Sequence, residues 1–255
     1  MSEPLAGRHA IVTGGGTGIG AAIALTLAEA GAHVTITGRR LAPLEEVAAK
    51  HARIGALICD VTDAAAVRTM IAAATDAHGA AGILVANAGA ALSRPFKAMS
   101  ADDIRSMVDV NLVGTFNLWR EGLAGVQAAG AQGRMIAVAS MASLKGYPYV
   151  AGYVAAKHAV LGLVRALSLE LAATGITVNA ICPGFTDTPM LAESVENIVA
   201  KTGQSAAEAQ KALSSGNPQG RFIAPSEIAQ TTLWLCSDAA RSVNGQAIAI
   251  SGGET

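Results

Sequence analysis

The chain has 255 residues, of which 51% are apolar, and its formal net charge at pH 7 is −1. The apolar content is ample for a sizeable core. The 18 basic and 19 acidic side chains nearly balance and aromatic residues make up only 4%, so neither a one-sided positive field nor a base-stacking surface is indicated. We therefore expect no nucleic-acid partner.

Metal ligands, a signal peptide and a membrane segment all lack support in the sequence. The cysteines (Cys59, Cys182 and Cys236) are isolated, and the five histidines follow no metal-ligand spacing. We expect three buried, reduced thiols and no metal. Residues 1–7 lack a charged start followed by an apolar run, and the longer apolar runs are interrupted well short of a membrane span. These features predict a cytoplasmic protein without a membrane partner.

The first part of the chain alternates predicted strands and helices. Strands are expected where short β-rich runs stop at glycine or polar residues, and helices where apolar residues recur at helical spacing. In chain order, we predict a strand over 8–13, a helix over 19–30, a strand over 33–37, a helix over 41–51, a strand over 54–59, a helix over 63–78 that Asp63 could cap, and a strand over 83–86.

The alternation continues to the end of the chain. The predicted elements are a helix over 102–126 capped near Ser100, a strand over 134–139, a helix over 154–173, a strand over 176–181, a mixed segment with helical stretches over 186–216, a helix over 226–236 introduced by Pro225, and a strand over 247–250. Strands that are apolar on both faces, each followed by a helix, indicate a parallel sheet covered on both sides. We predict an α/β fold, one Rossmann-like domain over 1–255 with a doubly wound parallel sheet of about seven strands.

A glycine-rich turn follows the first predicted strand, with the sequence Thr13-Gly14-Gly15-Gly16-Thr17-Gly18-Ile19-Gly20. Glycines permit a tight strand-to-helix turn and a close approach of the backbone to a pyrophosphate. The helix that follows offers free N–H groups and the positive end of its dipole. We predict a dinucleotide site here, contacted by Gly14, Gly16, Thr17, Gly18, Ile19 and Gly20.

The end of the second predicted strand reads Thr37-Gly38-Arg39-Arg40 and carries no acidic residue. An acid at this place would accept a hydrogen bond from the 2′-hydroxyl of the adenosine ribose, whereas an arginine favours a 2′-phosphate. We therefore favour NADP over NAD, with Arg39 reading the phosphate and Arg40 supporting it. NAD stays open, because the glycine turn has no basic residue and both arginines could be solvated surface cations.

Tyr153 and Lys157 are four residues apart in a predicted helix, so their side chains share one face. A nearby ammonium lowers the pKa of a phenol, ordinarily about 10, by roughly 1–3 units. Ser140 lies at the end of the fifth predicted strand, where it could bind a substrate oxygen. Asn111 lies within a predicted helix, an unfavourable position unless its side chain has a polar partner.

The G-x-x-x-G-x-G turn and these four residues resemble the classical short-chain dehydrogenase/reductase family over nearly the whole chain. The resemblance implies an oxidoreductase acting on CH–OH groups with NAD(P), and a homotetramer. It implies a catalytic tetrad in which Tyr153 is the general acid/base, Ser140 stabilises the substrate oxygen, Lys157 also bonds the nicotinamide ribose and Asn111 holds a water. It further implies that Asp60 and Val61 flank the adenine, that Asn87, Ala88 and Gly89 line the cofactor, and that Pro183, Gly184, Thr186 and Thr188 contact its nicotinamide half.

Three loops are expected to form the substrate pocket, and the segment 187–216 is long enough for a lid. The expected pocket residues are mainly apolar: Met141, Leu144, Tyr147, Met190 and Leu191. The stretches ELAATGITVNAICPGFTDTPM and RFIAPSE resemble 3-oxoacyl and polyketide ketoreductases, which implies a ketone, such as a 3-oxoacyl thioester, as the small-molecule substrate. However, residues 91–96 lack the Pro-Gly-Gly run of the polyketide members. The alternatives are a dehydrogenase of a small apolar, aryl or cyclic secondary alcohol, and a non-catalytic dinucleotide sensor.

Overall fold

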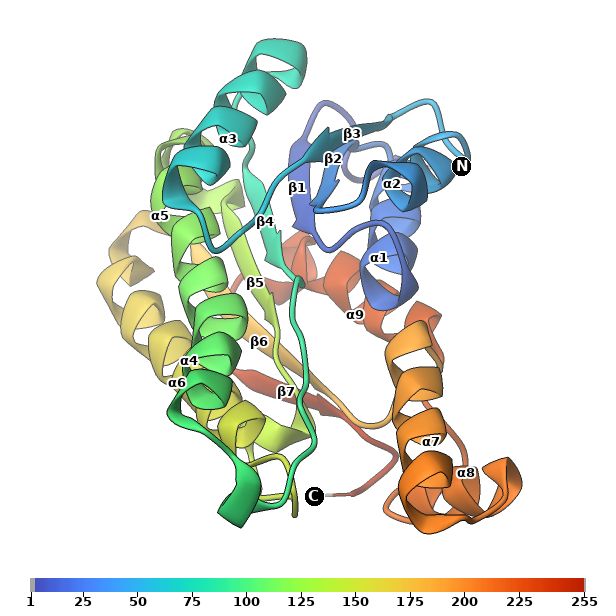
Figure 1. The fold of residues 1–255 in the computed structure, drawn as a ribbon. Helices are drawn as coiled ribbons and strands as arrows, with labels where there is room; N and C mark the ends of the chain where they lie inside the picture. The colour runs from blue at the N-terminus through green and yellow to red at the C-terminus, as the bar shows by residue number, and fades with distance from the viewer. Residues whose placement is uncertain (1–2, 255) are drawn as a thin grey trace.

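A computed structural model of the chain describes residues 3–254 and contains one seven-stranded sheet (Figure 1). The strand order is β3-β2-β1-β4-β5-β6-β7, and every neighbouring pair is parallel. The predicted doubly wound α/β sheet is confirmed. The strands are β1 (His9–Thr13), β2 (His33–Gly38), β3 (Ile54–Ile58), β4 (Ile83–Ala86), β5 (Arg134–Val138), β6 (Thr177–Pro183) and β7 (Ala247–Ile250).

Helices cover both faces of the sheet, with α1, α2 and α9 on one side and α3, α4, α5 and α6 on the other (Figure 1). Their bounds are α1 (Gly18–Glu29), α2 (Leu41–Ala48), α3 (Ala64–His78), α4 (Ala101–Val108), α5 (Gly114–Ala128), α6 (Ala151–Glu170), α7 (Pro189–Thr202), α8 (Ala206–Ser214) and α9 (Pro225–Leu235). Within residues 3–254, none of the helices combines the length and the apolar content needed to cross a bilayer.

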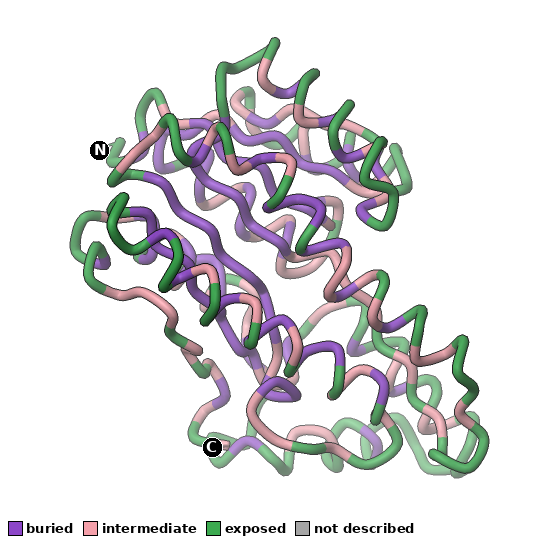
Figure 2. The backbone as a smooth tube through the Cα atoms, turned by 90° about the vertical axis from the view of Figure 1, so that its left-hand side faces the viewer, coloured by how far each residue is buried: buried purple, intermediate pink, exposed green. Residues whose placement is uncertain are grey.

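The strands are apolar on both faces because each face packs against a helical layer (Figure 2). In β1, Val12 belongs to the apolar cluster under α1 and α9, whereas its neighbour Ile11 belongs to the cluster under α3, α5 and α6. Every residue of β5 and of β6 is buried. The buried strands therefore form a rigid base for the loops at their carboxyl ends.

The helix that we expected over 102–126 is not continuous. Ser100 begins α4 with a capping box in which Asp103 takes part, as the sequence suggested, but α4 ends at Val108. A π-helical turn (Asp109–Val113) separates it from α5. The extra residue in this turn is a common feature of functional sites in helices, and it places Asn111 inside the protein.

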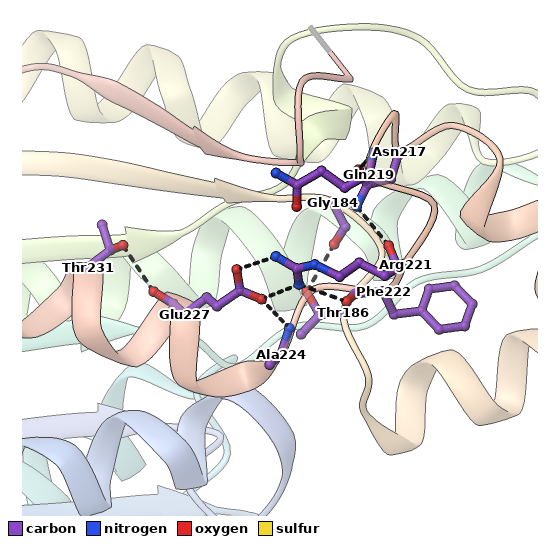
Figure 3. A network of polar contacts seen from close by, with 9 residues as sticks. All are labelled: Gly184, Thr186, Asn217, Gln219, Arg221, Phe222, Ala224, Glu227 and Thr231. Atoms are coloured by element: carbon purple, nitrogen blue, oxygen red, sulfur yellow. Dashed lines mark hydrogen bonds and ion pairs between the residues drawn. The ribbon is translucent and has the colours of Figure 1, made fainter.

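The chain leaves the sheet after β6, forms α7 and α8, and returns through residues 221–224 to α9. The returning segment pairs with the end of β6, because Ile223 N donates to the Phe185 carbonyl (2.9 Å) and Asp187 N donates to the Ile223 carbonyl (2.9 Å). Arg221 then binds Glu227 through two hydrogen bonds of 2.6 and 2.9 Å (Figure 3). This ion pair fixes the point where the chain rejoins the core.

Candidate active site

A cleft of about 210 Å³ opens at the carboxyl ends of β1, β4 and β5, where a doubly wound sheet binds its ligands. It brings together residues that are distant in the sequence. The lining consists of Gly14, Thr17, Gly18 and Ile19 from the glycine turn, Asn87, Ala88, Gly89 and Ala90 after β4, Asn111 from the π-helical turn, Val138 and Ala139 from β5, Tyr153 and Lys157 from α6, and Thr188, Pro189 and Met190 before and in α7.

The glycine turn is packed so tightly that side chains are excluded from part of it. A Cβ atom on Gly20 would lie 2.3 Å from the Gly14 carbonyl oxygen and 2.5 Å from the Asn87 amide nitrogen. The Asn87 side chain donates to the Thr13 carbonyl (2.9 Å) and so joins β4 to the turn. Thr17, at the N-cap of α1, makes no side-chain cap, and the first turn of α1 carries no acidic residue. The N–H groups at the start of α1 therefore suit the pyrophosphate of a dinucleotide.

Tyr153 and Lys157 lie on successive turns of α6, which begins at Ala151. The Lys157 ammonium donates to the Val138 carbonyl (2.9 Å) and lies 5.7 Å from the centre of the Tyr153 ring. Lys157 is only 5% exposed. Because burial disfavours its charged form, the pKa of Lys157 is lowered to about 8.

The pKa of Tyr153 moves in the opposite direction from the one expected. Burial raises it, and the Ser140 hydroxyl offsets this effect in part. Ser140 caps the short 3₁₀ turn Met141–Ser143, and its hydroxyl accepts a hydrogen bond from Ala142 N (3.1 Å). The structure thus brings Ser140 to the phenol of Tyr153.

Asn111 is 1% exposed, and its side-chain amide donates to the carbonyls of Ala90 (3.0 Å) and Met107 (2.9 Å). Its Oδ1 atom has no hydrogen-bond partner among the residues that the structure describes. A Cβ atom on Gly89 would lie 2.8 Å from this oxygen and 3.6 Å from the Lys157 ammonium nitrogen. The absence of a side chain at position 89 therefore leaves space for the amide of Asn111 beside Lys157.

The chain is similar to known proteins over most of its length. The family model for short chain dehydrogenases matches residues 8–199. The chain belongs to the short-chain dehydrogenase family. It is an NAD(P)-dependent oxidoreductase that interconverts a ketone and a secondary alcohol.

Several members of this family resemble the chain along their full length. It is 37% identical to a putative ketoacyl reductase of granaticin polyketide synthase from Streptomyces violaceoruber, over 96% of this chain and 92% of that protein. It is 35% identical to a 3beta-hydroxysteroid dehydrogenase from Mediterraneibacter gnavus, over 96% and 94%. A crystal structure of an actinorhodin polyketide ketoreductase variant with NADPH superposes with a TM-score of 0.94 at 32% identity, over 100% of this chain and 99% of that one.

The residues predicted for the adenosine end lie outside the cleft of this short-chain dehydrogenase. Arg39 and Arg40 are exposed after β2. The Asp60 carboxylate accepts two hydrogen bonds from Thr62, which together with Arg39 lower its pKa. Gly16 packs against α2, where a Cβ atom at this position would lie 3.2 Å from the Pro43 ring, so it serves helix packing and does not line the cleft.

Val61 also has a packing role on this side of the family fold. A Cβ atom on Gly114 would lie 2.6 Å from the Cγ2 atom of Val61. The Val61 carbonyl accepts a hydrogen bond from the Asn117 side chain (2.8 Å). The start of α5 is thereby held close to the end of β3.

Of the residues predicted for the nicotinamide end and for the substrate pocket, some line the cleft and others do not. Thr188 lines the cleft and caps α7, whereas Pro183, Gly184 and Thr186, at and after the end of β6, are not among the lining residues. Met190 lines the cleft. The other expected pocket residues do not: Met141 is 1% exposed in the core, Leu144 packs against the same core, Leu191 lines a separate cavity between α7 and α8, and Tyr147 binds Glu254.

Some residues of the cleft were not predicted from the sequence. Val138, Ala139 and Pro189 line it without a polar side chain, whereas Ala90 belongs to the loop over 90–97 that was expected to form part of the pocket. Each is adjacent or nearly adjacent in sequence to a residue that was predicted, such as Ser140 or Thr188. Proximity to those residues was the only signal that could have identified them.

Proposed function

We propose that this protein reduces a ketone of the 3-oxoacyl thioester class with NADPH, and that Tyr153 is the general acid. The observation that carries the proposal is one cleft in which Tyr153 and Lys157 of α6 face the glycine turn of β1 and α1. Ketoacyl reductases among the relatives favour this substrate class over a simple alcohol.

The residues that would hold the dinucleotide are Gly14, Gly18 and the start of α1 at the pyrophosphate, and Lys157 and Thr188 at the nicotinamide end. When bound, the nucleotide supplies the hydride that reduces the carbonyl carbon. Ser140 and Tyr153 bind the carbonyl oxygen as its negative charge grows, and Tyr153 transfers its phenolic proton to that oxygen. The buried ammonium of Lys157 stabilises the phenolate that remains. Proton transfer of this kind contributes about 10²–10⁴-fold to the rate.

Substitution of Tyr153 by phenylalanine tests the catalytic assignment. We expect the loss of about 10²–10⁴-fold in kcat/KM with unchanged nucleotide binding, since only the proton donor is removed. The assay follows NADPH absorbance with a 3-oxoacyl thioester, aryl ketones and cyclic ketones. Thr69→Val, which removes an exposed hydroxyl group on α3 away from the cleft, is the control. Undiminished turnover by Tyr153→Phe contradicts the assignment, and a wild type that binds NADPH but reduces none of the ketones supports the non-catalytic sensor.

The same panel decides between two substrate classes. The relatives include dehydrogenases named for a hydroxysteroid and for a dichlorocyclohexadienediol, both cyclic secondary alcohols, which favour the second candidate, a small apolar or cyclic secondary alcohol. In the oxidative direction, the kcat/KM for such an alcohol can be compared with the kcat/KM for a 3-hydroxyacyl thioester. A higher value for the alcohol would select the second candidate.

The preference for NADP rests on Arg39 and Arg40, which are exposed at the end of β2 where no acidic side chain follows. A charge-assisted hydrogen bond contributes about 1.5–3 kcal/mol. We therefore expect Arg39→Ala to raise the KM for NADPH about 10-fold or more and to leave the KM for NADH unchanged. Arg68→Ala, which removes an exposed arginine of α3, is the control. Equal changes in both KM values would contradict the assignment.

We further propose that residues 187–216 form a lid, that the protein is a homotetramer and that it is cytoplasmic. The lid is supported by α7 and α8, which extend beyond the sheet, and by Lys201, whose ammonium donates to the Ser93 carbonyl (3.4 Å) (Figure 1). The tetramer is supported by exposed apolar side chains on α5, α6 and α9, namely Phe116, Leu169 and Trp234. Light scattering coupled to gel filtration measures the assembly. Three free, buried cysteines suit a reducing compartment.

A further inference from the structure

A buried carboxylate lies against the loop between Ser140 and Tyr153, and the reaction outlined above does not use it. It belongs to Glu254, in the short segment that follows β7. The Glu254 side chain is only 4% exposed. Its Oε1 atom accepts a hydrogen bond from the Tyr147 hydroxyl (2.6 Å) and pairs with the Lys145 ammonium (3.0 Å). Removing a charge from water is costly unless it is paired, so this site is specifically built to hold the carboxylate.

The carboxylate lies where three segments of the site meet. Tyr147 and Lys145 belong to the loop that joins Ser140 to Tyr153. Cβ atoms added to Gly184, at the end of β6, and to Gly216, at the end of the proposed lid, would lie 3.4 and 3.1 Å from its two oxygens. Both positions lack side chains, which leaves room for the carboxylate. Glu254 therefore contacts the loop, the strand end and the lid end at once.

The hydrogen bond to Glu254 determines what Tyr147 can offer a substrate. Its hydroxyl already donates to the carboxylate, so it is not free to donate to a ligand. Its ring meets the Phe185 ring edge-on, with 6.4 Å between the centres. Tyr147 and Phe185 thus pack against each other, and Glu254 holds the hydroxyl end of Tyr147.

The same loop is fixed again two residues later. Tyr149 adopts a φ of 67°, a left-handed conformation that is costly for a residue with a side chain. Its carbonyl accepts a hydrogen bond from Arg94 N (2.7 Å), and the Arg94 guanidinium pairs with Asp103 (2.7 Å). A loop in a strained conformation keeps it only when its surroundings impose it, so the anchor at Tyr147 matters for the geometry of the loop.

We propose that Glu254 is a positioning residue for the ketone reaction: through Tyr147 it fixes the loop 141–150, and this loop orients the substrate against Tyr153. The inference rests on the proposed function for its effect on turnover. Its structural part, the anchoring of the loop by Glu254, stands independently of which ketone is the substrate.

The kinetic test uses Glu254→Ala, Glu254→Gln, Tyr147→Phe and the double variant Glu254→Ala/Tyr147→Phe. Loss of a hydrogen bond to a charged group should raise the KM for the ketone about 10-fold, with the KM for NADPH unchanged. Glu254→Gln keeps an acceptor for the Tyr147 hydroxyl and should retain most of the wild-type affinity. The double variant should be no worse than Glu254→Ala alone, since Tyr147→Phe removes only a contact that Glu254→Ala has already broken.

The control variant is Glu121→Ala, which removes an arginine ion pair between α3 and α5, away from the cleft. It should leave the KM for the ketone unchanged. If Glu254→Ala lowers the melting temperature but leaves that KM unchanged, or if the losses in the double variant add, Glu254 has only a structural role and the proposal is overturned.

Hydrogen exchange provides a measurement that needs no substrate. In Glu254→Ala and Tyr147→Phe, backbone amides of residues 141–150 should exchange faster than in the wild type, whereas amides of β1 and β5 should not change. Unchanged exchange in this loop would overturn the anchor even if the ketone assay succeeds. Faster exchange in a protein that reduces no ketone would retain the anchor and reject the proposed function.

Discussion

Replacing Lys157 by methionine should stabilise the protein near pH 7 while abolishing ketone reduction. Lys157 is 5% exposed, and burial lowers its pKa from 10.5 to about 8. The unfolded chain therefore binds more protons than the folded protein between these two values. The stability of the wild type must rise with pH across this range, and below pH 8 the full cost of a buried ammonium is present.

The displacement of the pKa corresponds to about 3 kcal/mol. Methionine has a similar length and no charge, so Lys157→Met avoids this cost. It loses the hydrogen bond to the Val138 carbonyl, which contributes about 1.5–3 kcal/mol because the donor is charged. The variant should therefore be more stable by up to about 1.5 kcal/mol near pH 7, and its stability relative to the wild type should fall by about 2 kcal/mol as the pH approaches 9.5.

Urea denaturation of both proteins across this pH range measures the difference, and Lys211→Met, at an exposed lysine of α8, is the matched control. Two-state unfolding with equal m-values is required for the comparison. A difference between Lys157→Met and wild type that stays constant with pH would refute the reasoning, because it would mean that the ammonium is not desolvated by folding.

Two further predictions follow from close contacts and from the fixed return of the chain. Gly89→Ala should lower kcat/KM about 100-fold and stability by about 1–3 kcal/mol, because the added methyl group would lie 2.8 Å from the Asn111 side-chain oxygen. Steady-state kinetics measure the first effect and thermal unfolding the second. A variant with the kcat/KM of the wild type would contradict this prediction. Hydrogen bonds from Arg221 and from the Ala224 backbone lower the pKa of Glu227 to about 2, so its contribution is present above pH 4.5 and is lost as the pH falls toward 2. Glu227→Gln should therefore remove about 1 kcal/mol near neutral pH, a small value for a partly exposed pair, and flatten acid unfolding in this range; an unchanged acid transition would show that the pair does not form.

The alternation of buried strands and amphipathic helices was readable from the sequence because it depends on local periodicity. The strand over 83–86 and the strand over 247–250 were predicted with the bounds that the structure has. The division of the helix over 102–126 was not predicted, since residue type does not specify the extra residue of the π-helical turn at Asp109–Val113, where the Asn111 amide binds the distant Ala90 carbonyl.

The site shows the same limit. Tyr153 and Lys157 were identified from a four-residue spacing, which fixes their common face in any helix. Whether Met141 lines a pocket or enters the core depends on how the turn after β5 packs, and the structure buries it. Tyr147 gave no sequence signal for its partner, because Glu254 lies more than a hundred residues away.

The class of fold, the glycine turn that suits a dinucleotide and the residue types that can transfer a proton could all be predicted from the sequence, since each depends on local spacing and on side-chain chemistry. Which groups lose their water and which charges pair became clear only from the folded chain. Burial raises the pKa of Tyr153 and lowers that of Lys157. The fold also brings the Glu254 carboxylate to the loop that joins Ser140 to Tyr153. Desolvation and long-range pairing arise from segments far apart in the chain, so no local pattern could have specified them.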